Sequence, residues 1–177
     1  MQKLCSLHEH SGLRSDQAAN FTTKEIFEHL IKELEEVASF EEIQGILKSI
    51  GSLGRNVLQI VAERNDSPEL HLTLWNIFRK YFESPEMLNF INHCDESGDR
   101  LIHNVVQWNA IEIIELTWNE IKKFISTKVD QIEYLKTKGY KGKDLLERSL
   151  EHVEEDPDVR KWVENLMSEY EIDIKKD

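Results

Sequence analysis

Three side chains in the middle of the chain could bind a metal or perform acid–base chemistry: His93, Cys94 and His103. A thiol and two imidazoles are typical zinc ligands, but their spacing matches no closed set of zinc ligands. An imidazole can also act as a general base, yet no nucleophile stands at a fixed position beside His103. The run His8-Glu9-His10 is too short for a helical metal site, where the two histidines stand four residues apart. We therefore expect no catalytic residue, metal or cofactor. A small helical metal-binding protein or enzyme built on these three residues is kept as the alternative.

The composition limits the classes of protein to which the chain can belong. Its 177 residues suit one domain or a short repeat array, and the 40% of hydrophobic residues can form a core. The formal net charge of −12 argues against binding to nucleic acid or to an anionic membrane surface. No apolar run approaches the roughly 20 residues of a membrane span. Two distant cysteines and the lack of a secretory signal predict a cytoplasmic location, with nuclear entry open.

Three glycines reveal a repeat, because Gly54, Gly98 and Gly142 stand 44 residues apart. Apolar residues recur in the same register at three, four and eight positions after each glycine. Each period contains three helical patterns, and strand-like alternation is absent. The first helix of each period is expected at residues 57–64, 101–108 and 145–152, the second at 24–37, 69–82, 110–125 and 158–170, and the third at 40–50, 85–93 and 129–136.

One such unit cannot bury its own apolar stripe, whereas stacked units bury a continuous core. The sequence therefore predicts an all-α solenoid of stacked helical repeats over residues 22–170. We divide it into a partial repeat at 22–53 and repeats at 54–97, 98–141 and 142–170. Residues 1–21 are expected to form a loose N-terminal arm, and residues 171–177 an acidic or polar tail.

The run from Gly98 to Leu116 resembles the ankyrin repeat, which reads G-x-T-P-L-H-x-A-A-x-x-G-H-x-E-V-V-x-L-L. Gly98 matches the turn glycine, Ile102-His103 match the Leu-His pair, and Asn109 matches the second glycine. The run after Gly54 resembles the consensus again. The Thr-Pro pair is missing, and the period is 44 residues rather than 33, with a third helix in place of the β-hairpin finger. The chain is identified as a divergent ankyrin-repeat protein, and armadillo-like three-helix repeats are the alternative.

The resemblance implies a function: a non-catalytic interaction module or adaptor that binds another protein on its concave face. It is therefore expected to be a monomer that contacts neither nucleic acid nor membranes. A host-directed decoy resembling the inhibitors of NF-κB-type transcription factors is an alternative of the same class. In the family frame His103 is structural, because its ring bonds the backbone and steadies the turn.

The resemblance also implies which residues contact a partner. They lie around the turn glycine and at the end of the first helix, where the family reads its partners. Further residues at these positions are Ser52, Leu53, Glu96, Ser97 and Glu151. Trp108 is the candidate hot spot for binding. The expected partner-binding residues are Arg55, Glu63, Arg64, Asp99, Gln107, Trp108, Tyr140, Lys141, Lys143 and His152.

Charge is distributed unevenly along the chain. Residues 122–143 contain seven lysines against two acids, a net charge of +5, whereas residues 144–177 contain twelve acids against five bases, a net charge of −7. The basic stretch either meets the acidic C-terminal region of the same chain or receives an acidic segment of a partner.

Overall fold

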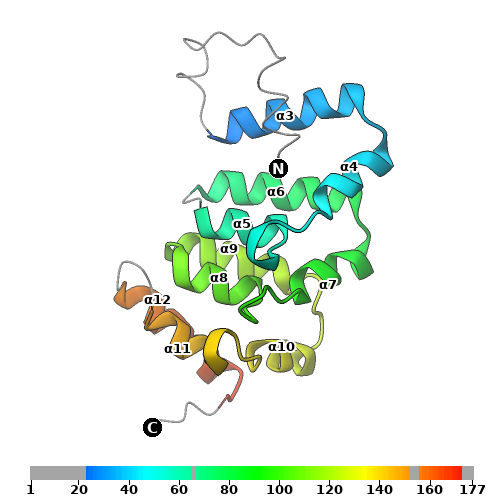
Figure 1. Ribbon diagram of the computed structural model, residues 1–177. Coiled ribbons are helices and arrows are strands. Elements are labelled where there is room, and N and C mark those ends of the chain that lie inside the picture. The colour runs from blue at the N-terminus through cyan, green and yellow to red at the C-terminus, as the bar shows by residue number, and fades with distance from the viewer. Residues whose placement is uncertain (1–22, 65–66, 152–155, 173–177) are drawn as a thin grey trace.

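The computed structural model describes residues 23–64, 67–151 and 156–172, and every regular element in these ranges is a helix. The predicted all-α class is therefore confirmed for this part of the chain (Figure 1). The expected N-terminal arm and residues 173–177 of the expected tail lie outside the described residues. The elements are α3 (Thr23–Val37), α4 (Phe40–Leu47), η1 (Ser52–Gly54), α5 (Val57–Arg64), α6 (Pro68–Tyr81), α7 (Ser84–Asn92), α8 (Leu101–Trp108), α9 (Ile111–Ile121), α10 (Lys128–Leu135), η2 (Tyr140–Gly142), α11 (Leu145–Ser149) and α12 (Pro157–Glu169).

Equivalent helices begin at the same point of successive periods. The helices α5, α8 and α11 begin at residues 57, 101 and 145, and α4, α7 and α10 begin at residues 40, 84 and 128. Both series keep the 44-residue spacing of the sequence. Three helices end at least three residues earlier than predicted: α4 at Leu47, α9 at Ile121 and α11 at Ser149. After α9, the N–H groups of Lys123 and Phe124 bond carbonyls three residues earlier, which closes the helix in a tighter turn.

The helices pack in two ranks. In the first rank, α8 packs between α5 and α11. In the second rank, α3, α6, α9 and α12 follow one another in contact. The third helices of the periods, α4, α7 and α10, lie along one side of the ranks (Figure 1). Each of them leads through a short connection to the next helix of the first rank, and these connections contain several of the residues expected to contact a partner.

The middle helix of the first rank shows what holds the ranks together. All six residues from Leu101 to Val106 are buried, because α5 and α11 flank α8 and α9 packs behind it. Full burial of an Ile, Leu or Val side chain contributes about 1.5–3 kcal/mol. Trp75 and Trp118 of the second rank are also buried. Within the described ranges, no helix combines the length and the apolar character needed to cross a membrane.

Candidate partner-binding edge

The connections between the third and first helices are closed by the same backbone hydrogen bond. We call them the first tip (residues 50–55), the second tip (94–99) and the third tip (138–143). In each tip, the N–H of the second residue donates to the carbonyl of the sixth residue, at 2.8, 3.0 and 2.8 Å respectively. The repeat seen in the sequence is therefore also a repeat of turn geometry.

Glycines are required at two kinds of position in the tips. The φ angles of Gly54, Gly98 and Gly142 are 69°, 85° and 72°, in the left-handed region that favours glycine. Gly139 is needed for space, because a Cβ atom there would lie 2.0 Å from Oδ1 of Asp99. The first requirement explains why glycine recurs every 44 residues. The second shows that the third tip approaches the second tip closely.

Hydrogen bonds join the first tip to the second. The N–H of Glu96 donates to the carbonyl of Leu53 at 2.9 Å. Arg55 Nε pairs with Oδ2 of Asp95 at 3.1 Å, and the Asp95 side chain is fully buried. Oδ1 of Asp95 accepts from the N–H groups of Ser97 and Asp99, both at 2.9 Å. The charge of Asp95 is thus compensated by an arginine and by two backbone donors of its own tip.

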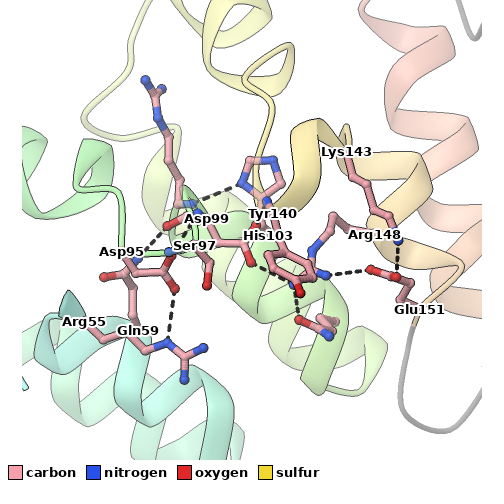
Figure 2. A network of polar contacts seen from close by, with 12 residues as sticks. Arg55, Gln59, Asp95, Ser97, Asp99, His103, Tyr140, Lys143, Arg148 and Glu151 are labelled. Carbon is pink, nitrogen blue, oxygen red and sulfur yellow. Dashed lines mark hydrogen bonds and ion pairs between the residues drawn. The ribbon is translucent and has the colours of Figure 1, made fainter. Parts of the chain in front are cut away.

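A second set of contacts joins the second tip to the third (Figure 2). Asp99 Oδ1 accepts from the N–H of Tyr140 at 2.8 Å, and Asp99 Oδ2 accepts from Nη2 of Arg148 at 2.8 Å. The Arg148 guanidinium also donates to Gln107 and, at 2.7 Å, to Glu151. Both the Arg148 and Asp99 side chains are almost completely buried, which makes this a buried ion pair.

The carboxylate of Glu151 continues the same network toward the surface. It forms ion pairs with Lys143 of the third tip and with Arg148 of α11. The hydrogen bond from Lys143, followed by that from Arg148, holds the pKa of Glu151 below its ordinary value. The third tip is therefore fixed to α11 as well as to the second tip.

The third residue of each first-rank helix caps the start of its own helix. The side chains of Gln59, His103 and Glu147 accept from the backbone N–H three residues earlier, at 3.1, 3.2 and 2.8 Å. These three residues stand 44 positions apart, so one structural role is performed by three different residue types. Satisfying an N-terminal N–H in this way stabilises a helix start.

Gln59 and His103 also reach the neighbouring period. Gln59 Nε2 donates to the carbonyl of His93 at 3.4 Å, and the equivalent bond joins His103 Nε2 to the carbonyl of Thr137 at 2.9 Å. Because the N–H of Arg100 donates to Nδ1 of His103, the hydrogen of the neutral ring is on Nε2. Burial lowers the pKa of His103. His103 thus bonds the backbone through both ring nitrogens, which is the structural role expected of it.

The structure separates the residues expected at the surface into two groups. The prediction that Asp99 is accessible is wrong: the residue is only 2% exposed, because Tyr140 and Arg148 close over its carboxylate. Arg55, Gln107 and Lys143 are half-buried, and each holds the network described above. These four residues position the tips.

Tyr140 and Lys141, in contrast, are exposed on the third tip, and Leu53 and Glu96 are exposed on the first and second. Trp108 is half-buried at the end of α8, and its indole N–H is buried without a hydrogen-bond partner among the described residues. Glu63 and Arg64 lie in α5, but their side chains are outside the description, and His152 is outside it altogether. Contact of any of these residues with a partner stays a prediction.

Two residues of the network were not predicted from the sequence. Gln59 stands 44 residues before His103, so the repeat register could have identified its role. Arg148 has no such signal, because the residue 44 positions earlier is Asn104 and the arginine reaches its aspartate only through the fold.

The side chains that could have formed a zinc site have other contacts. His93 Nε2 lies 2.6 Å from the carbonyl of Gly54, and His103 binds the backbone on both sides. Cys94 is exposed. Among the described residues, no group of three His, Cys, Asp or Glu side chains is placed to hold a metal ion. No protein-family model, curated protein or solved structure matches this chain.

Proposed function

We propose that this chain is a divergent ankyrin-like solenoid that binds another protein through the row of three tips and catalyses no reaction. The observation that carries the proposal is the combination of one repeated closing hydrogen bond with different exposed side chains. The backbone bond that closes each tip is the same in all three, whereas the outward residues are Leu53, Glu96 and Tyr140 with Lys141. A surface of this kind can recognise a partner by side-chain chemistry on a constant frame.

The helical arrangement supports the solenoid part of the proposal. Stacking of α5, α8 and α11 in one rank and of α3, α6, α9 and α12 in the other is the expected result of repeats that bury a shared core. The positive φ at the turn glycines and the two backbone bonds of His103 agree with the ankyrin resemblance. They favour it over the armadillo-like alternative, which rests on the third helix alone.

The contacts between tips support binding rather than catalysis. Buried ion pairs and backbone hydrogen bonds fix each tip to the next before any partner arrives. A surface that is already ordered loses little conformational entropy on association. The histidines that could act as bases are engaged with backbone groups, and Asp95 and Asp99 are engaged with arginines and N–H groups.

Affinity capture with single-residue variants tests the proposal. Leu53→Asp changes an exposed residue of the first tip, and Leu72→Asp makes the same change at a similarly exposed position of the second rank. We expect proteins captured by the intact chain to be lost with Leu53→Asp and retained with Leu72→Asp. Circular dichroism of both variants checks folding. If both variants capture the same proteins as the unmodified chain, the tips are not the binding surface.

A further inference from the structure

The exposed chemistry of the tips changes in one direction along the row. The first tip exposes Ile50 and Leu53, which are 52% and 53% accessible. The second tip exposes Glu96 and the small side chain of Cys94. The third tip exposes Lys138, Lys141 and the Tyr140 ring, which is 39% accessible. The row is thus apolar at one end, acidic in the middle and basic with an aromatic ring at the other end.

The apolar end carries two unfavourable features at a single residue. Leu53 exposes a large aliphatic side chain, and its φ angle of 62° lies in the left-handed region. That conformation costs a residue with a Cβ atom about 1–2 kcal/mol. Lys141, at the equivalent position of the third tip, has the same left-handed conformation with a φ of 57°, whereas Ser97 of the second tip has no positive φ. Strained, exposed residues of this kind are concentrated at ligand-binding sites.

The basic end is not neutralised by the described part of the chain. Lys128 and Lys143 pair with Glu171 and Glu151, so part of the basic stretch does meet the acidic C-terminal region. Lys136, Lys138 and Lys141 are exposed and form no ion pair with a described acid. The ammonium group of Lys141 lies 4.8 Å from the centre of the Tyr140 ring. Three exposed lysines without an acidic partner among the described residues, one of them beside an aromatic ring, complement an acidic segment of a partner.

The spacing of the tips sets the length of that segment. Packed helices lie about 8–10 Å apart, so two steps along the first rank span roughly 20 Å. An extended chain advances about 3.3 Å per residue, so roughly six residues cover this distance. Exposed Glu96 in the second tip disfavours carboxylates in the part of the segment that crosses this tip.

These observations identify a kind of partner, on the condition that the proposed function holds. We infer that the tips bind an extended acidic segment of another protein. A large apolar side chain of this segment contacts Ile50 and Leu53. A neutral stretch crosses the second tip, and a cluster of carboxylates about six residues from the apolar anchor pairs with Lys138 and Lys141.

Selection of random 16-residue peptides displayed on phage against the intact chain tests the inference. Enriched peptides are expected to combine an apolar residue with an acidic cluster at this separation. We expect Lys138→Glu with Lys141→Glu, and separately Leu53→Asp, to weaken binding of the synthetic peptides at least tenfold. Folding should survive at Leu53, because aspartate accepts a left-handed φ more readily than leucine. The double variant Lys32→Glu with Lys161→Glu makes the same charge change on exposed second-rank residues and is expected to bind within twofold of the unmodified chain.

The outcomes separate the two proposals. If the enriched peptides contain no acidic cluster but bind the tip variants more weakly than the unmodified chain, the inferred partner chemistry is overturned. The proposal that the tips are the binding surface would still hold. Peptides that bind all variants equally, or a selection that enriches no peptide, would overturn both. An acidic cluster next to the apolar residue, with no spacing between them, would contradict the inferred path along the row.

Discussion

The two junctions between tips share one pair of equivalent hydrogen bonds, made by Gln59 and His103, but differ in their ion pairs. The first junction joins the first and second tips through the Arg55–Asp95 ion pair and the neutral side chain of Gln59. The second junction joins the second and third tips through the Asp99–Arg148 ion pair and through His103. The arginine is 11% exposed at the first junction and 4% at the second. Gln59 and His103 show that the fold accepts different polar side chains at one repeat position when both bond the equivalent backbone N–H and carbonyl.

The largest expected difference between the junctions is the loss in the free energy of unfolding when the arginine of each ion pair is replaced. Arg148→Met leaves the Asp99 carboxylate buried with a single N–H donor, and breaking a buried pair in this way costs about 3–5 kcal/mol. Arg55→Met should cost less, about 2 kcal/mol, because Asp95 keeps two backbone donors. Urea unfolding of both variants measures the difference. Equal losses would show that the second junction is no more dependent on its ion pair than the first.

Glutamine, the residue at position 59, should be able to replace histidine at the equivalent position 103. His103→Ala removes the acceptor of one backbone N–H and the donor to one backbone carbonyl, at a cost of about 3 kcal/mol in the free energy of unfolding. His103→Gln installs the residue that performs the same role at the first junction and should cost less than about 1 kcal/mol at pH 7.5. Thermal unfolding of the two variants decides. A glutamine variant as unstable as the alanine variant would contradict the shared role.

Protonation should distinguish the second junction from the first. Burial keeps the pKa of His103 below its ordinary value of 6.5, so the unfolded chain binds the proton more readily than the folded chain. Stability due to the neutral ring is then fully present above pH 6.5 and is lost as the pH falls below it, by at most about 1.4 kcal/mol per pH unit. Asp99, Arg100 and Arg148 act on the ring in both directions, but burial dominates.

The control for this pH effect is His103→Gln, because its carboxylates are those of the unmodified chain. We expect the free energy of unfolding of the unmodified chain to fall more between pH 7.5 and pH 5.5 than that of the variant. Parallel curves for the two proteins would mean that His103 is not the group responsible.

The period and most helix limits could be predicted because local physics fixes them. A left-handed φ in each tip demands glycine, so Gly54, Gly98 and Gly142 mark the period in the sequence. Burial of one helix face fixes the apolar register that follows each glycine. The start of α5, α8 and α11 was predicted to the residue for the same reason.

The burial of Asp99 could not be predicted, because it depends on a residue 49 positions away. In the family frame the position after the turn glycine faces a partner, but here Arg148 from α11 and the N–H of Tyr140 enclose the carboxylate. The sequence pattern contains no sign of that contact. The missing Thr-Pro pair and the third helix already show that the turn differs from the family, and the aspartate is where this difference has its largest effect.

The smallest expected effect concerns backbone strain at Leu53 in the first tip. Leu53→Asn should relieve the cost of a left-handed φ and stabilise the chain by about 0.5–1 kcal/mol, while it weakens partner binding. Ser97→Asn, at the equivalent position of the second tip, should give no such gain because Ser97 has no positive φ. Thermal unfolding measures both variants. Equal stabilisation of the two would contradict the claim that Leu53 is strained.

Hydrogen–deuterium exchange of the intact chain, with and without a bound peptide from the selection, tests the central claim most directly. If the three tips form one binding edge, the peptide should slow exchange in residues 50–55, 94–99 and 138–143 together, and leave α6 and α9 unchanged. Slowed exchange confined to the second rank, or to a single tip, would contradict the claim that the row acts as one surface.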